Sequence, residues 1–400
     1  MPEIIRAGTD ADFIALLPAL VGMRLDRSLV LVTFAGTRTI HAARFDLPLR
    51  RDTRTLRSLA DACVSLAART PGADGVSVVV VTDSTFEHER GIPWHELARA
   101  VDTRMGRAGF RVVSMLCSAA DGWGRYDARG DDRGPWPLEE ITGSEGAADA
   151  ARFFGELEVA SAMAALPAEE PELYPLIDAA IDQIVDEWEL VDALRAGHHD
   201  IVPPSTATGI HRAVERALGI ALADGSAEVD ADALGMLTAY ASTPSWRDTI
   251  TLQIAFGRRI GEIAAAQQRE WNRRKAEHGG SMDEVVTAAL ANGDAVESET
   301  DRLIAGRGDE APDVDRCRAG ISTLLRAAAN VEAPARPGLL CMAGWLCWAI
   351  GRASAADLLL AEALQIEPGH RMSRMIRTLV AAGAVPDWAF APAGEDDSEW

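Results

Sequence analysis

The spacing of hydrophobic and polar positions changes character near residue 140. Before that point, short apolar runs of strand length alternate with helical segments. The strands predicted from these runs cover residues 28–35, 39–45, 75–82, 110–118 and 122–127. The run GVSVVVVT at 75–82 is almost continuously apolar, which is typical of a strand covered on both faces, so we expect it at the centre of a sheet.

Between these strands the apolar positions recur at helical spacing, and the helices predicted there span residues 10–23, 52–69 and 93–108. The tripeptide Gly-Thr-Arg at 36–38 has the length and composition of a hairpin loop. Helices and strands in this order indicate a mixed α/β domain at residues 1–140. The polar Gly/Pro segment DDRGPWP at 131–137 supplies the predicted boundary.

From residue 143 onward the strand signals disappear and helical periodicity continues. The helices expected here span residues 146–166, 172–196, 207–223, 230–241, 245–274, 282–306 and 312–331. An all-helical domain at 141–391 is therefore predicted, followed by an acidic, disordered tail at 392–400. The fold class predicted for the whole chain is α+β.

The helical domain ends in a hairpin at 337–370 that is followed by a third helix. Its spacing resembles a tetratricopeptide unit, in which a large residue, a small residue, Gly and a large residue are followed by Ala, a large residue and Pro. The matching residues here are Leu340, Ala343, Gly344, Cys347, Ala356, Leu360 and Pro368. No second copy lies upstream at a 34-residue offset, so the alternative is one such hairpin packed on other helices of a globular domain.

Charge and composition narrow the classes of partner. The formal net charge is −22, Lys275 is the single lysine, and no run dense in Lys or Arg is present, which argues against nucleic acid and against an anionic membrane surface. No apolar stretch reaches the ~18–20 residues of a membrane span, and the N-terminal residues do not resemble a signal peptide. A cytoplasmic location is expected. The oligomeric state is not determined by the sequence.

Cysteine and histidine spacing gives no metal or cofactor motif. The five cysteines are scattered, no CxxC pair occurs, and buried thiols in a reducing compartment are expected. His88 and His95 are seven residues apart and are separated by Gly91 and Pro93, so they do not have helical metal-ligand spacing. We therefore predict no metal site and no cofactor.

Several positions together resemble the family called domain of unknown function 4192, a group of actinobacterial proteins. The residues that carry the resemblance are Asp12, Pro18, Gly22, Ser28-Leu29-Val30, Arg44-x-Asp46-Leu47-Pro48, Trp123, Arg247-Asp248 and the segment from Trp345 to Pro368. The resemblance extends over nearly the whole chain. It implies a fold and a cytoplasmic bacterial setting, and it implies no particular reaction.

Polar residues at or just beyond the strand ends form the first candidate site. Arg44, Asp46, Asp83, Ser84 and Arg125 could bind a small anion or a guanidinium-like group, because loops at the carboxyl edge of α/β sheets collect ligands. The alternative is that Arg44 and Asp46 pair within the sheet or cap the next helix. Asp46 and Asp83 share an edge only if their strands run in the same direction.

Arg247 and Asp248, at the start of a helix after Pro244-Ser245-Trp246, form the second candidate site. An acidic residue in a first helical turn interacts favourably with the helix dipole. The pair could contact a ligand, or it could be a salt bridge between the two domains.

Three hypotheses about function follow from these features. The first is a protein-binding or adaptor module that recognises a partner segment through its helical domain. The second is an enzyme or small-ligand binder with a site in the cleft between the domains, and the third is a structural oligomer. The GxSxG, GxxxxGK[ST] and strand-linked GxGxxG motifs do not occur, so serine hydrolases, P-loop nucleotidases and Rossmann oxidoreductases lack their defining residues here.

Overall fold

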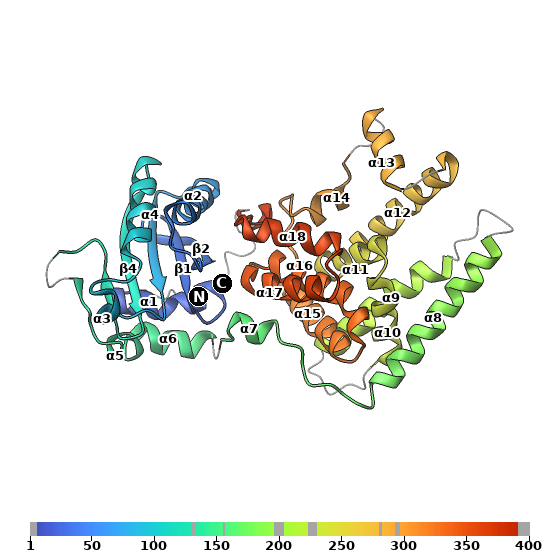
Figure 1. The fold of residues 1–400 in the computed structure, drawn as a ribbon, viewed down its shortest axis with the longest axis horizontal. Coiled ribbons are helices and arrows are strands. Elements are labelled where there is room, and N and C mark those ends of the chain that lie inside the picture. Colours follow the sequence, from blue (N-terminus) through green and yellow to red (C-terminus); the bar gives the residue numbers. More distant parts are fainter. Residues whose placement is uncertain are drawn as a thin grey trace. The chain divides into compact units, whose positions relative to one another are not determined.

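The structure is a computed structural model that describes residues 6–129, 133–154, 157–195, 204–222, 230–279, 282–292 and 297–390. It divides into two compact units, Met1–Met163 and Ala164–Ala391, called the α/β unit and the helical unit below. Each is described by itself (Figure 1). The α+β class predicted from the sequence is confirmed by a five-stranded mixed sheet followed by helices.

The sheet of the α/β unit has the order β2-β1-β3-β4-β5. Its strands are β1 Ser28–Ala35, β2 Arg38–Asp46, β3 Gly75–Val81, β4 Arg111–Ala119 and β5 Gly122–Arg125. β3 and β4 are parallel, and the other three pairings are antiparallel. β3 lies at the centre, as its continuous apolar run predicts, and its first six residues are buried.

Strand direction settles which polar residues share an edge. β1 is antiparallel to both β2 and β3, so β2 and β3 run the same way. Ser28 pairs with Asp46 on one side and with Val81 on the other. The carboxyl ends of β2 and β3 therefore lie at one edge of the sheet, beside the start of β1.

Helices pack against this sheet. The helices of the unit are α1 Asp10–Val21, α2 Thr53–Arg69, α3 Phe86–Glu89, α4 His95–Arg107, α5 Glu139–Thr142, α6 Glu145–Phe154 and α7 Ala160–Met163. Ile14 and Leu17 of α1 form one core cluster with Val30, Val79 and Leu116 of the strands. α2 and α4 pack against each other (Figure 1).

The segment after residue 140 belongs to the α/β unit in the structure. α6 packs on α1, and the backbone N–H of Gly146 donates to Asp12 Oδ1 at 2.9 Å. A β-carbon on Gly146 would come within 2.5 Å of the Asp12 carbonyl oxygen, so the two helices touch at this point. The predicted domain boundary after 140 stays a prediction, while the compact units divide after Met163. The predicted tail at 392–400 lies outside the described residues.

The helical unit follows the predicted periodicity in outline. Its helices are α8 Tyr174–Arg195, α9 Pro204–Leu222, α10 Ala231–Ala241, α11 Pro244–Phe256, α12 Arg258–His278, α13 Met282–Ala291, α14 Glu299–Ile304, α15 Val314–Ala329, α16 Arg336–Ala349, α17 Ala353–Ile366 and α18 Arg371–Ala381. Two short 3-10 turns, Ala333–Ala335 and Asp387–Phe390, complete it.

Three of the long helices predicted from the sequence are each two helices. The segment predicted as one helix at 245–274 is α11 and α12, which meet at Gly257 with a φ of 82°. That backbone conformation suits glycine and ends a helix. Residues 146–166 likewise form α6 and α7, and residues 282–306 form α13 and α14.

The C-terminal hairpin is α16 and α17, and its small residues allow close packing. A β-carbon on Gly344 would lie 2.9 Å from Leu360 Cγ, so glycine is needed where the two helices meet. α16 also packs on α15, and α17 packs on α18. Leu340, Leu359 and Leu360 are fully buried by these neighbours. The tetratricopeptide-like character of the hairpin stays a prediction.

In the part of the chain that the structure describes, no helix has both the length and the apolar character needed to cross a membrane.

Candidate functional site

The carboxyl end of β2 holds a buried arginine. The side chain of Arg44 is 6% exposed, and its Nη2 lies 2.8 Å from Asp46 Oδ1 and 3.1 Å from Asp26 Oδ1. Its Nε donates to Ser28 Oγ at 2.5 Å, and Ser28 Oγ–H in turn donates to the Asp26 carbonyl at 2.5 Å. These contacts tie the turn before β1 to the end of β2.

The carboxyl end of β3 continues this edge with a second ion pair. Arg27 Nη1 donates to both carboxylate oxygens of Asp83, at 2.9 and 3.0 Å. The Arg27 guanidinium lowers the pKa of Asp83, so the carboxylate is charged at neutral pH. Both side chains are well exposed, at 43% and 63%, and such surface pairs contribute little to stability.

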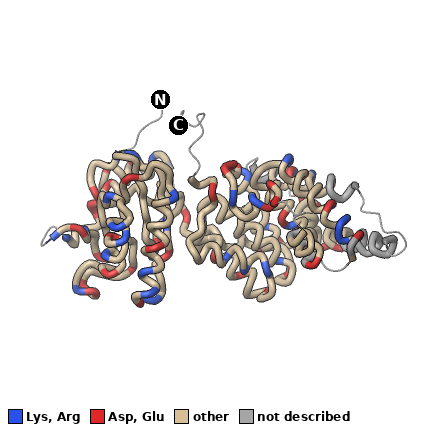
Figure 2. Tube along the Cα trace, turned by 90° about the horizontal axis from the view of Figure 1, so that it is seen from above, with Lys and Arg blue, Asp and Glu red and all other residues tan. Residues whose placement is uncertain are grey.

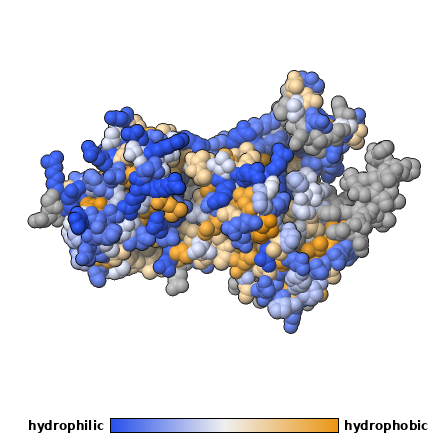
Figure 3. All heavy atoms as spheres, viewed as in Figure 1, coloured by the Kyte–Doolittle hydropathy of each residue, from blue (hydrophilic) through white to orange (hydrophobic). Residues whose placement is uncertain are grey.

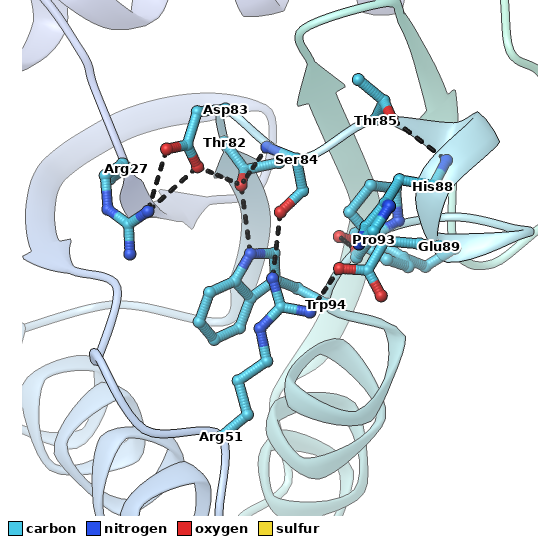
Figure 4. A network of polar contacts seen from close by, with 11 residues as sticks. Arg27, Arg51, Thr82, Asp83, Ser84, Thr85, His88, Glu89, Pro93 and Trp94 are labelled. Atoms are coloured by element: carbon cyan, nitrogen blue, oxygen red, sulfur yellow. Dashed lines mark hydrogen bonds and ion pairs between the residues drawn. The ribbon is translucent and has the colours of Figure 1, made fainter.

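A third arginine closes the network around Trp94, as Figure 4 shows. The Arg51 guanidinium lies 4.0 Å from the centre of the Trp94 ring, in cation–π geometry. It also donates to Ser84 Oγ at 3.0 Å and to Glu89 Oε1 at 2.5 Å. Trp94 is buried, and its Nε1–H donates to Thr82 Oγ1 at 3.1 Å.

Backbone strain also gathers at this edge. Among the described residues, the non-glycine residues with positive φ are Arg27, Arg90 and Trp94, at 36°, 52° and 59°. One precedes β1 and the other two lie in the connection from β3 to α4. Such conformations cost about 1–3 kcal/mol each and persist only where surrounding contacts hold them. The ion pairs and the Arg51–Trp94 stack are contacts of that kind.

Arg125 is not part of the edge network. It lies in β5 opposite Leu116, and its guanidinium contacts Asp10 at 2.8 Å and Asp127 at 3.1 Å. Asp10 is the first residue of α1, and burial raises its pKa while Arg125 opposes that rise. Of the sequence-predicted residues, the structure thus brings Arg44, Asp46 and Asp83 to one edge and leaves Arg125 apart.

Arg247 and Asp248 lie in the helical unit, in the first turns of α11. Arg247 Nε donates to Asp248 Oδ1 at 3.0 Å and Nη2 lies 2.9 Å from the same oxygen. The Arg247 side chain is 9% exposed, whereas Asp248 is 37% exposed. Partial burial raises the pKa of Asp248, and the neighbouring guanidinium opposes that rise. The partners of this pair lie within the helical unit.

Arg247 lines a cavity of about 810 Å³. The first turns of α11, α16 and α18 contribute Pro244, Arg247, Pro337, Gly338, Arg371 and Met372 to the wall. The other lining residues are Ile181, Thr238, Ala239, Ser242, Pro334, Ala335, Glu367, Gly369, His370 and Met375. We call this cavity the helical pocket. Two arginines and the amino ends of three helices favour an anion there, whereas the Glu367 carboxylate and the carboxyl ends of α10 and α17 oppose one.

His370 fixes the inner wall of the helical pocket. It is 9% exposed, and its Nε2 lies 3.4 Å from Arg247 Nη1. Its Nδ1 accepts the backbone N–H of Ser373 at 3.3 Å, which caps α18, and lies 2.8 Å from Ser373 Oγ. Burial, and next the Arg247 charge, lower the pKa of His370, so the ring is neutral at neutral pH.

One comparison with known proteins decides the family. The family model described as Domain of unknown function (DUF4192) matches residues 11–273 and 310–387. The chain belongs to this family. The resemblance read from the sequence is thereby confirmed, and the DUF4192 match includes both the sheet edge and the helical pocket. Neither the curated proteins nor the solved structures gave a match.

Several of the residues that carried the DUF4192 resemblance make contacts inside their own unit. Asp12 caps α1 and receives the Gly146 N–H, Arg44 binds Ser28, and Gly22 ends α1 in the left-handed conformation with a φ of 75°. These contacts give Asp12, Gly22 and Arg44 a role in stabilising the fold. They do not indicate a ligand or a reaction, so a function has to be inferred from the pockets.

Sequence reasoning missed Arg27, Arg51 and His370. Arg27 lies between the helix predicted at 10–23 and the strand predicted at 28–35, and the available signal was a charged residue directly before an apolar run. The segment Pro368-Gly369-His370 carried a helix-start signal, since a polar residue after a Pro-Gly turn commonly caps a helix. In the described residues, no group of three or more His, Cys, Asp or Glu side chains could hold a metal ion.

The five cysteines are free and buried. Burial raises the pKa of Cys63, Cys117, Cys317 and Cys347 to about 12 and that of Cys341 to about 11. Thiols in this state are poor nucleophiles. They act as small apolar residues of the core.

Proposed function

We propose that the protein binds a small molecule with an anionic group, a carboxylate or a phosphate, in the helical pocket. The observation that carries the proposal is Arg247, whose side chain is 9% exposed and nevertheless lines a cavity of about 810 Å³. Ligand cavities in proteins commonly measure about 300–1,000 Å³. A buried guanidinium at such a wall interacts with an anion far more strongly than an exposed one.

The donors of Arg247 support this assignment. A guanidinium carries five N–H groups. Contacts to Asp248 use Nε and Nη2 once each, and the contact to His370 uses at most one hydrogen of Nη1. Two N–H donors remain that no contact with a described residue uses, and a bound carboxylate or phosphate could accept from them.

The rest of the wall suits a ligand that is only partly polar. Arg371 is exposed at the start of α18 and provides a second positive charge. The first turns of three helices add backbone dipoles that favour an anion, and the carboxyl ends of α10 and α17 offset part of that effect. Ile181, Ala239 and Met372 provide apolar surface. An organic acid or phosphate ester with an apolar body fits these features better than a bare ion does.

The sheet edge is a weaker candidate for the same role. Its arginines already face carboxylates of their own unit, and the Arg27–Asp83 pair is largely in solvent. A ligand there would have to displace formed ion pairs, and at the exposed Arg27–Asp83 pair each contact is worth little. Arg247, one of the residues behind the enzyme-or-binder hypothesis, is retained in this proposal, and the proposed ligand lies within the helical unit.

A protein-binding or adaptor role is the second candidate, and an exposed apolar surface favours it. Leu358 of α17 and Met375 of α18 are 44% and 49% exposed. On the face drawn in Figure 3, hydrophobic areas are larger over the helical unit than over the α/β unit. Leu340 and Leu360, which match the tetratricopeptide spacing, are buried, so a partner would have to use these outer positions instead.

A matched pair of variants tests the ligand proposal. Arg371→Ala removes a pocket charge from an exposed position, and Arg377→Ala removes an arginine of the same helix that bonds Asp357 and does not line the pocket. We expect small carboxylates and phosphate monoesters to raise the melting temperature of the wild type and of Arg377→Ala, with affinity roughly tenfold lower in Arg371→Ala. Equal binding by both variants would contradict the proposal.

A further inference from the structure

A second cavity lies in the α/β unit, at the carboxyl ends of the two parallel strands. It measures about 420 Å³ and is bounded by Val81 at the end of β3 and Ser118 near the end of β4. Its other lining residues are Ile14, Ala15, Pro18, Ala19, Arg24, Leu25, Ile141, Thr142, Ala147, Ala150, Ala151 and Leu157. We call it the strand-end pocket. In α/β sheets the crevice outside the carboxyl ends of parallel strands is where ligands bind.

The network of Figure 4 supports the rim of this pocket. Val81 is followed directly by Thr82 and Asp83, and Thr82 N–H donates to the Ser118 carbonyl at 2.9 Å. Asp83 binds Arg27, two residues after the lining residue Leu25. The strained Arg27 backbone and its ion pair therefore hold the two sides of the opening in place.

The strand-end pocket has few polar side chains, two hydroxyls and one guanidinium. Ser118 and Thr142 offer hydroxyls, and Arg24 offers a guanidinium. Arg24 is exposed and forms no ion pair with any residue that the structure describes. Pro18 has no N–H, so it cannot donate to the carbonyl of Ile14 one turn before it, and both residues line the cavity. All other lining side chains are apolar.

From this composition we infer that the strand-end pocket binds a second ligand, an apolar molecule that carries one acidic group. The apolar body fills the space between α1, α6 and the strand ends, and the acidic group contacts Arg24 at the opening. Binding apolar surface in such a cavity gives the affinity, while the single charge sets the orientation. The inference is independent of the helical pocket and of any ligand bound there.

The probe for the test is 8-anilinonaphthalene-1-sulfonate, which has an apolar body and one sulfonate. Its fluorescence is titrated against the full chain carrying Arg371→Ala, so that the helical pocket contributes little. We expect saturable binding that weakens on the order of tenfold when Arg24→Gln is added. Arg24→Lys, which keeps the charge, is expected to retain most of the affinity.

A matched pair on α6 tests the cavity itself. Ala150→Phe fills the strand-end pocket, whereas Ala148→Phe adds the same ring at an exposed position of the same helix that does not line it. Loss of probe binding in Ala150→Phe alone supports the inference. Absence of probe binding to the parent chain, or equal affinities in the Ala150→Phe, Ala148→Phe and Arg24→Gln chains, would overturn it. Because Arg24 is exposed, Arg24→Gln keeps the test valid should Ala150→Phe fail to fold.

Discussion

At the scale of single residues, the buried polar groups of the protein act first on folding. Asp12 is 7% exposed and accepts four hydrogen bonds, from the N–H of Gly8, Thr9 and Gly146 and from the Thr9 hydroxyl. The Gly146 N–H is the largest cause of the lowered pKa of Asp12. One carboxylate thus caps α1 and holds α6 against it.

Asp12→Asn should destabilise the protein by about 1–3 kcal/mol, because an amide cannot accept on both of its polar atoms. The free energy of unfolding, from urea denaturation monitored by circular dichroism, measures the loss. Asp102→Asn, at an exposed position of α4, is the control and should change little. A similar loss of unfolding free energy in both variants would show that the Asp12 hydrogen bonds contribute no more to stability than an exposed carboxylate does.

The same residue gives a pH dependence with a definite sign. The pKa of Asp12 is lower in the folded chain than its unfolded value of about 3.9. Its contribution is therefore complete above that unfolded value and is lost as the pH falls from about 4 through the folded-state pKa. The wild type should lose its advantage over Asp12→Asn in this range.

Residue-level chemistry at the candidate site could be predicted only in part. The sequence indicated Arg44, Asp46 and Asp83 at strand ends, but their common edge depends on β1 being antiparallel to both neighbours. The partners Arg27 and Arg51 come from a turn and a loop, and no periodic pattern predicts where such residues point. The pairing of Arg247 with His370, 123 positions apart, is a tertiary contact that spacing does not reveal.

At the scale of secondary-structure elements, the periodic pattern of apolar positions predicted most of the strands and helices. The five strands and the central place of β3 follow from apolar runs that must be covered on one or both faces. The predictions of long continuous helices were wrong where the break between two helices has no strong sequence signal. Gly257 is one glycine in an otherwise helical pattern, and it adopts a φ of 82° where α11 ends and α12 begins.

The contact between α16 and α17 gives a prediction at this scale. Gly344→Ala would place a β-carbon 2.9 Å from Leu360 Cγ, and we expect a loss of about 1–3 kcal/mol in the free energy of unfolding from overpacking. Gly219→Ala in α9 is the matched control. Its β-carbon would meet nothing within 4 Å, so the higher helix propensity of alanine should stabilise that variant by up to about 1 kcal/mol.

Urea denaturation of both glycine variants decides the point. Opposite signs for the two substitutions are expected from the packing described above. If Gly344→Ala is as stable as the wild type, then the close approach of the two helices is not what requires glycine there.

At the scale of the whole molecule, the net charge of −22 disfavours anions at long range. Figure 2 shows, however, that acidic and basic residues are interspersed in both units. Surface charges are screened beyond roughly 10 Å at 0.1 M salt. Local groups therefore dominate inside a pocket, and the guanidinium groups of Arg247 and Arg371 can hold an anion despite the overall charge.

We propose above all that the helical pocket binds an anion. The most direct test is an anomalous difference map from crystals of the full chain soaked with selenate, a phosphate mimic whose selenium can be located by itself. We expect a selenium peak in the helical pocket within hydrogen-bonding distance of the Arg247 and Arg371 guanidinium groups, and no such peak in Arg371→Ala crystals. Selenium peaks confined to arginines on the outer surface, with none beside Arg247, would contradict it.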